Sequence, residues 1–160
     1  MLTELQKGHS LNTRKIVKFT EELSQEEALF RPYGAVNNFL WNLGHATTVR
    51  NTIIKILNPA VELDVYENER EFFGNGSALQ ANEVYPEISF ILEHFIKRGE
   101  QIHELLGTVS EEYLQQEATV KAGPDPLSNE ALLWFFYNHE TEHLGEMKIL
   151  KNLANRLRNA

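Results

Sequence analysis

The chain has 160 residues, a net charge of −8 and no cysteine, and 42% of its residues are hydrophobic. These totals are typical of one globular domain, which we expect to span residues 1–160. The absence of cysteine excludes disulfides, thiolate metal ligands and a cysteine nucleophile. The negative charge, with no run of Lys or Arg, argues against a nucleic-acid partner.

The N-terminal residues lack the charged-then-apolar layout of a signal peptide. No apolar run approaches the roughly 20 residues that a membrane span needs. We therefore expect a soluble, cytoplasmic protein that does not enter a membrane.

Apolar residues at helical spacing predict four long helices. The first covers residues 2–23, and Ser24 to Glu27 then fits a capping box that opens a short helical turn through Phe30. The second helix covers residues 37–57 and ends at Asn58-Pro59. The third begins in the turn that contains Pro86 and ends at Gly107, and the fourth runs from its N-cap Ser128 to about Asn155.

The segments between these helices are polar or irregular. Residues 62–81 contain Gly74-Asn75-Gly76-Ser77 and predict a long connection. Ser110 to Tyr113 suggests another short turn, and residues 116–127 hold two prolines that exclude regular structure. With no strand-like alternation, the pattern predicts an all-α fold, a four-helix bundle with a long crossover between its second and third helices.

Residues 139–143, His-Glu-Thr-Glu-His, match H-E-x-x-H, the helical zinc signature in which Glu acts as general base. A zinc protease also needs a third ligand downstream and a sheet for its substrate. No histidine follows His143, and no strand is predicted. The HExxH zinc protease is therefore a disfavoured alternative.

On a helical wheel, His139 and His143 lie together on the face of the fourth helix that we expect to be the inward one, and Glu146 falls on the same face. Glu140 points toward the flank, with Lys151. Imidazoles four residues apart can bind one metal ion, although two hydrogen-bonded core histidines are the simpler alternative.

The opposite face of this helix carries several apolar side chains, which predict a partner surface and a homodimer unless a crossover loop covers them. These residues are Leu133, Trp134, Tyr137 and Leu144.

A third histidine would favour metal binding. His45 lies beside an apolar arc of the second helix, where Gly44 would let another helix approach closely. His94 and His103 have charged neighbours and read as surface residues. His9 stays open as a candidate.

WNLGHA in the second helix and NHETEHLGEMKIL in the fourth resemble the two signatures of the DinB/YfiT-like superfamily, small bacterial four-helix proteins distinct from the DNA polymerase called DinB. The resemblance covers most of the chain, including Arg31-Pro32 and the long crossover. It implies an up-down bundle with one divalent metal held by His45, His139 and His143. The superfamily includes thiol-dependent transferases and metal-dependent hydrolases.

An open site with three histidines is the catalytic pattern, because positions stay free for water or substrate. We therefore expect a metal-dependent enzyme with a small-molecule substrate or thiol cosubstrate, using Zn, Ni, Fe or Mn. Glu146 is a candidate to orient water or accept its proton, or else a partner of a ligating histidine. The alternatives are a non-catalytic metal-binding or stress-response module and a metal-free interaction protein.

Overall fold

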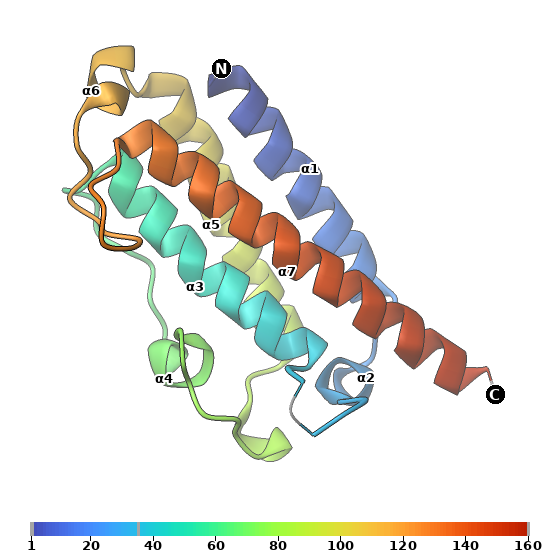
Figure 1. Cartoon of the computed structure of the whole chain (residues 1–160). Helices are drawn as coiled ribbons and strands as arrows, with labels where there is room; N and C mark the ends of the chain where they lie inside the picture. Colours follow the sequence, from blue (N-terminus) through green and yellow to red (C-terminus); the bar gives the residue numbers. More distant parts are fainter. Residues whose placement is uncertain (1, 35, 160) are drawn as a thin grey trace.

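The computed structural model describes residues 2–34 and 36–159, whose regular secondary structure is helical (Figure 1). Its elements in chain order are α1 (Leu2–Glu21), α2 (Gln25–Leu29), α3 (Phe39–Leu57), α4 (Glu69–Phe73), the 3₁₀ helix η1 (Asn82–Val84), α5 (Ile88–Thr108), α6 (Glu111–Gln115) and α7 (Asn129–Arg158). Within these described ranges the only extended pairing is an isolated bridge between Glu117 and Ser128. The all-α prediction is confirmed.

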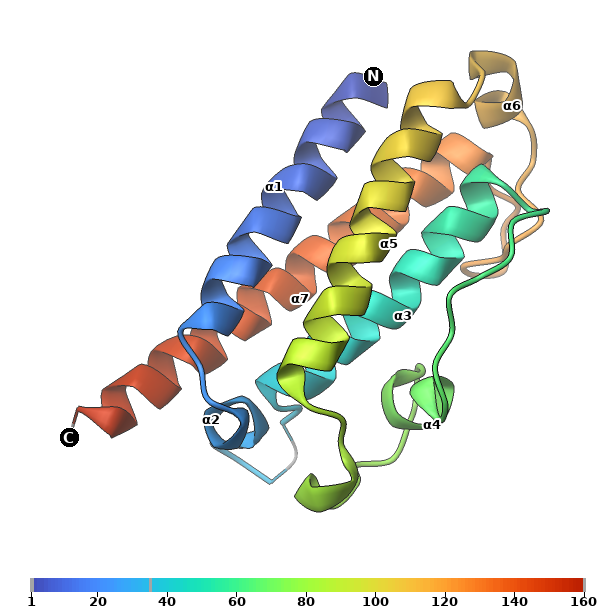
Figure 2. The same ribbon diagram turned by 180° about the vertical axis from the view of Figure 1, so that it is seen from behind.

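The four long helices α1, α3, α5 and α7 form a bundle in which α3 and α1 each pack against both α5 and α7. Figures 1 and 2 show that α1 and α7 run in one direction and that α3 and α5 run in the other. The predicted crossover is thus confirmed, because residues 58–87 carry the chain back along the bundle. Strict up-down alternation was wrong, since that return makes α3 and α5 parallel.

Several helix ends follow the predicted chemistry. Ser24 and Glu27 form a reciprocal capping box at α2, and the Ser128 hydroxyl accepts a hydrogen bond from the first turn of α7. The third long helix was predicted to hold Pro86 in its first turn, but α5 begins two residues later, at Ile88, and Pro86 lies outside it. There Gln25 supplies the cap, accepting from the Ile88 N–H at 2.8 Å and donating to the Pro86 carbonyl at 3.2 Å.

The long connection contains more order than its polar sequence predicts. Its short helix α4 buries Phe73 completely and leaves Glu69 only 2% exposed. The ring of Phe73 lies directly over Gly44, where any Cβ atom would overlap it. Gly44 thus allows a close helix approach, as predicted, and the approaching helix is α4.

The core consists of two apolar clusters, one toward the α2 end of the bundle and one toward the α6 end. Each long helix places buried polar side chains between them. These are His9 and Asn12 on α1, Thr47 and Arg50 on α3, Arg98 on α5 and Glu140 on α7. The bundle therefore has a polar layer across its middle, which must be fully hydrogen-bonded to be tolerated.

An ion pair between Arg50 and Glu140 dominates this layer. The Arg50 Nε and Nη2 atoms lie 2.7 and 3.1 Å from the two carboxylate oxygens. The remaining guanidinium donors reach the Phe95 carbonyl at 2.6 Å and Thr13 Oγ1 at 2.8 Å. Asn12 donates to Glu140 from α1 at 3.2 Å. The pair thus connects all four long helices.

The burial of Glu140 corrects the wheel prediction, which placed this side chain on the flank with Lys151. Lys151 instead pairs with Glu22 at 2.7 Å. The stripe of α7 that faces the core runs through Glu140, Leu144 and Met147, because the helix is rotated relative to the predicted wheel.

The predicted outer face of α7 is wrong for the same reason. Leu133 and Leu144 are buried, and Trp134 and Tyr137 are half-buried against the second cluster. The homodimer stays a prediction, but it loses this surface as its basis.

Across the described residues, no helix has the length and hydropathy that a membrane span requires. The cytoplasmic location and the single domain over residues 1–160 stay predictions.

Replacing Glu140 with Gln should lower the free energy of unfolding of the metal-free protein by about 3–5 kcal/mol, since Arg50 would keep its charge in the core without a counter-charge. Urea unfolding measures this loss. Arg158→Gln is the control, because it breaks the more exposed ion pair with Glu27 and should cost much less. Equal losses in the two variants would contradict the dominant role of the buried pair.

Candidate metal centre

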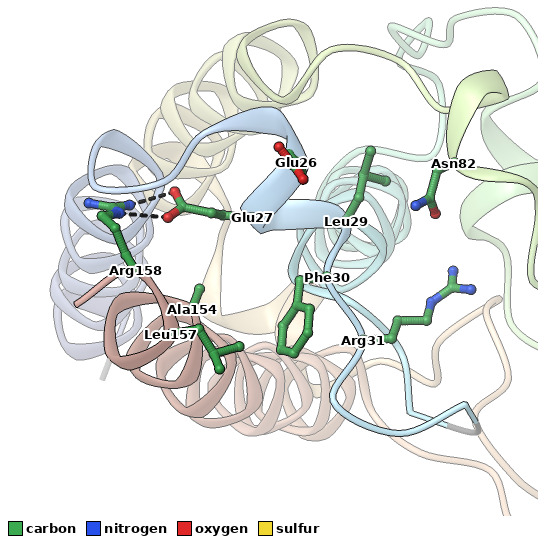
Figure 3. Close-up of a pocket in the computed structure, with 9 residues that line it drawn as sticks. All are labelled: Glu26, Glu27, Leu29, Phe30, Arg31, Asn82, Ala154, Leu157 and Arg158. Atoms are coloured by element: carbon green, nitrogen blue, oxygen red, sulfur yellow. Dashed lines mark hydrogen bonds and ion pairs between the residues drawn. The ribbon is translucent and has the colours of Figure 1, made fainter. Parts of the chain in front are cut away.

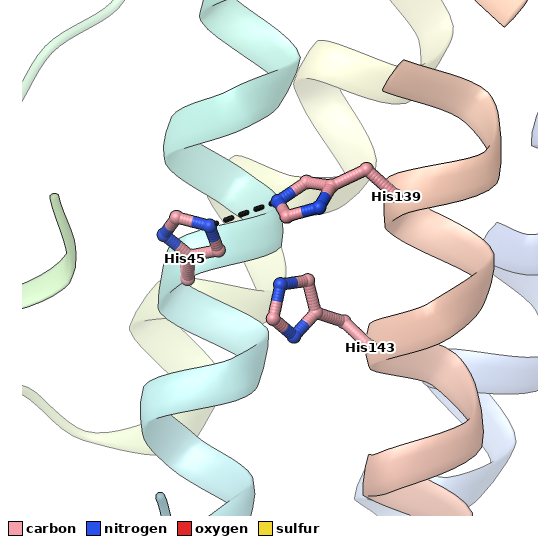
Figure 4. A group of neighbouring side chains, drawn as sticks. All are labelled: His45, His139 and His143. Carbon is pink, nitrogen blue, oxygen red and sulfur yellow. Dashed lines mark hydrogen bonds between the residues drawn. The ribbon is translucent and has the colours of Figure 1, made fainter. Parts of the chain in front are cut away.

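Three histidines meet between α3 and α7, with one ring nitrogen from each lying within 4.8 Å of the others (Figure 4). His45 comes from α3 and is 6% exposed, and His139 and His143 come from consecutive turns of α7 and are half-buried. These are the three residues that the sequence analysis selected. The spacing of these three nitrogens would allow the cluster to hold a metal ion.

The other candidate histidines lie elsewhere. His9 is buried on α1, with Nδ1 at 3.4 Å from the Glu140 carboxylate. His94 pairs with Asp64 at 2.7 Å, and His103 is exposed. None of the three belongs to the cluster, so the open question about His9 is resolved.

The orientation of His45 is set by a backbone carbonyl. Its Nδ1 atom lies 2.7 Å from the Phe73 oxygen, and a carbonyl oxygen can only accept a hydrogen bond. Nδ1 must therefore carry the proton, and the Nε2 atom of the neutral ring keeps its lone pair. That lone pair faces His139, whose Nε2 atom is 3.0 Å away.

His143 is oriented in the same way by an amide. Its Nδ1 atom lies 2.8 Å from the Asn42 side-chain oxygen and 3.0 Å from a Glu146 oxygen. The Asn42 nitrogen donates to the Asn38 carbonyl at 3.0 Å, so the amide oxygen is the atom that faces His143. Both neighbours accept, and the proton again belongs on Nδ1.

These contacts fit a bound cation. Metal–nitrogen bonds of about 2.0–2.1 Å place two imidazole nitrogens roughly 3–3.4 Å apart, in agreement with the 3.0 Å between His45 and His139. Trp41 stacks on His45 with ring centroids 4.8 Å apart and closes one side. The half-buried rings of His139 and His143 and the Glu146 carboxylate, 55% exposed, leave the other side accessible.

The sequence profile of the DinB superfamily matches residues 10–147. The chain belongs to the DinB superfamily. A conserved protein from Enterococcus faecalis has a similar crystal structure, with a TM-score of 0.73 and 13% sequence identity over 96% of both chains, which supports the fold of this DinB-superfamily protein. A comparison with curated proteins found no match.

The electrostatics of this DinB-superfamily site favour neutral imidazoles. Burial and, to a smaller extent, the neighbouring His45 together lower the pKa of His143 to about 4. Burial also lowers the pKa of His45 and of His139, and each has a second imidazole beside it that acts in the same direction. Neutral rings are the form that binds metal, so protons compete little for this site near neutral pH.

The two nearby carboxyl groups differ. Burial raises the pKa of Glu146, and Glu142 adds to this effect. Burial also acts to raise the pKa of Glu140, but Arg50 and His9 hold it well below the usual range. Since Glu140 is a poor base that faces the core, the protease interpretation loses its general base.

Two surface pockets lie away from the histidines. One has a volume of about 610 Å³ and lies between α2, η1 and the end of α7, where Phe30, Arg31 and Asn82 contribute to its lining (Figure 3). Glu27 and Arg158 form an ion pair at its rim. The other is lined mainly by acidic residues of α5 and of the connection before α4. Neither is lined by the three histidines.

Two groups that orient the ligand candidates, Asn42 and the Phe73 carbonyl, were not predicted from the sequence. Asn42 lies in the WNLGHA motif, four residues after Asn38, so the two residues are one helical turn apart. This spacing could have indicated that the Asn42 amide bonds the preceding turn. The Phe73 carbonyl is a backbone group, and no residue type reveals it.

The lowered pKa values predict that the metal-free protein loses stability as the pH falls from about 6.5 to 4.5. An unfolded histidine binds a proton near pH 6.5, whereas the folded His143 does so near pH 4. The unfolded state therefore binds more protons in this range, and acid favours it. Urea unfolding at several pH values and NMR titration of His143 measure the effect. A titration of His143 near pH 6.5 would contradict it.

Proposed function

We propose that this protein binds one divalent metal ion through His45, His139 and His143. The observation that carries the proposal is the occupation of the Nδ1 atoms of His45 and His143 by hydrogen bonds to oxygen, which directs their Nε2 atoms into the cluster with His139. The fit of three neutral nitrogen donors favours Zn, Ni, Fe or Mn over Mg or Ca.

We further propose that the protein is a metal-dependent enzyme, a thiol-dependent transferase or a hydrolase, acting on a small molecule. A divalent ion with open positions lowers the pKa of a coordinated water or thiol and so supplies a nucleophile near neutral pH. The half-buried His139 and His143 support this proposal, because a reactant can approach them, whereas Trp41 keeps water away from His45.

Glu146 is the proposed proton acceptor. Its Oε2 atom lies 3.0 Å from Nδ1 of His143, and its carboxylate is 55% exposed at the accessible side. A pKa raised by burial makes the carboxylate a better base than an ordinary surface glutamate. Glu146 can therefore take up a proton at Oε1 while Oε2 still accepts the hydrogen bond from His143 Nδ1.

Protein purified without a nickel column should carry about one equivalent of metal, and His45→Ala should lose most of it, since a site with two ligands binds weakly. Mass-spectrometric metal analysis measures both. His103→Ala is the control, because this exposed ring lies outside the cluster and its loss should change nothing. Full occupancy in His45→Ala would show that the three-histidine site is wrong.

Glu146→Gln should lower turnover by about 100-fold or more and leave the bound metal unchanged, because the amide cannot accept the proton. Assays with panels of small thiols, electrophiles and hydrolysable esters and amides provide the measurement. Glu142→Gln is the matched control: it removes a neighbouring charge that only helps to raise the pKa of Glu146, so it should lower turnover far less. If metal-loaded wild type turns over no compound, the non-catalytic metal-binding module is the better function.

A further inference from the structure

The carbonyl groups in the last turn of α4 contact side chains of α3, directly or through Ser77. In any helix the final carbonyls lack partners within the helix, and in α4 other groups take them. The Phe72 carbonyl accepts from the Ser77 hydroxyl at 2.9 Å, and that hydroxyl accepts from the Trp41 indole at 3.0 Å. The Phe73 carbonyl accepts from Nδ1 of His45 at 2.7 Å. The position of α4 therefore decides the orientation of the Trp41 indole and of the His45 imidazole.

A helix of five residues cannot hold this position alone, because isolated helices of that length are unstable in water. Its first residue, Glu69, is anchored by Arg98 of α5, and both side chains are almost fully buried, at 2% and 0% exposure. Arg98 Nη2 lies 2.9 Å from one Glu69 oxygen, and Arg98 Nη1 contacts the other. Thr48 of α3 also donates to Glu69, at 3.1 Å.

The second anchor lies at the other end of α4. The Phe73 ring fills the space over Gly44, the residue that precedes His45. The ring is fully buried in the first apolar cluster. An ion pair at one end and an aromatic contact at the other thus leave α4 little freedom to shift along α3.

We propose that Arg98 and Glu69 are positioning residues of the metal centre, acting on His45 through α4 and the Phe73 carbonyl. This inference rests on the proposed function, because it assigns the pair a role toward the metal. The chain of contacts runs from the Arg98 guanidinium to the Glu69 carboxylate, through the backbone of α4, and from the Phe73 oxygen to His45 Nδ1. The pair keeps the proton on Nδ1 and the Nε2 lone pair directed into the cluster.

A merely structural ion pair makes a different prediction. Its loss would lower the stability of the metal-free protein but leave the metal affinity of folded molecules unchanged. Loss of a positioning contact lowers that affinity by about 10- to 100-fold. It also changes the tautomer of His45, which is visible in the metal-free protein.

The experiment uses two variants of the full chain that disturb α4 at opposite ends. Glu69→Gln removes the charge that holds Arg98, and Gly44→Ala places a methyl group against the Phe73 ring. For each folded variant, nitrogen-15 NMR of the imidazoles reports the His45 tautomer without metal. Zinc affinity is measured by competition with a chelator. If Glu69→Gln does not fold, Thr48→Val removes a hydrogen bond from the same carboxylate more gently.

Two controls isolate the effect. Gly145→Ala changes a helical glycine of α7 whose added Cβ would meet no atom within 4 Å. Leu106→Ala lowers stability from the far end of α5, where Leu106 is 1% exposed in the second apolar cluster. Both controls should retain the Nδ1–H tautomer of His45 and the zinc affinity of the wild type.

The expected result is a mixed or reversed His45 tautomer, with zinc affinity reduced about 10- to 100-fold, in the α4 variants alone. An unchanged tautomer with affinity within twofold of wild type would overturn the inference. An equal loss in Leu106→Ala would also overturn it, since lower stability alone would then explain the result. If wild type binds no zinc, the proposed function fails, and the tautomer of the metal-free variants still decides whether α4 positions His45.

Discussion

The buried ion pair between Arg50 and Glu140 is the interaction on which the rest of the bundle depends. It joins α3 to α7, the two helices that carry the clustered histidines. A buried charge is tolerated only when its partner and its remaining hydrogen bonds are in place, so this pair permits few rotations of α7 about its axis. Because Glu140 directly follows His139, the rotation that brings its carboxylate to Arg50 also turns His139 and His143 toward α3. The ion pair and the histidine cluster are therefore two consequences of one helix orientation.

The polar layer across the middle of the bundle explains how such a short chain holds a polar site. Two apolar clusters, one on each side of the layer, supply the burial that stabilises the fold. Between them, each buried charge reaches across helices: Arg50 to Glu140, and Arg98 to Glu69. An apolar middle layer of the same volume would often be at least as stable. The polar layer lies directly beside the histidines, and its two ion pairs fix the helices that carry or contact them.

The sequence predicted the four long helices, the crossover and the pair His139 and His143, because apolar periodicity, caps and the i, i+4 spacing are local signals. His45 joined them as the third ligand through the resemblance to the DinB/YfiT-like superfamily. Glu140 was misplaced because a wheel assigns charged residues to the outside, and its partner Arg50 lies 90 residues away in the chain. The same reason hid Arg98 and Glu69. The helix α4 escaped prediction because five residues show too little periodicity. Its contribution to the cluster is a backbone oxygen, which is invisible in any pattern of side chains.

The H-E-x-x-H pattern acquires a different meaning from these contacts. Successive residues of a helix point about 100° apart, so a glutamate directly after the first histidine cannot share the direction of two histidines four residues apart. In this bundle the Glu140 side chain points into the core, where its carboxylate secures the helix to Arg50. A carboxylate that serves the histidine face must instead lie three or four residues from a histidine. Glu146 satisfies this condition, three residues after His143 and in contact with it. Helical position alone therefore separates the glutamate that secures α7 to Arg50 from the glutamate that contacts His143.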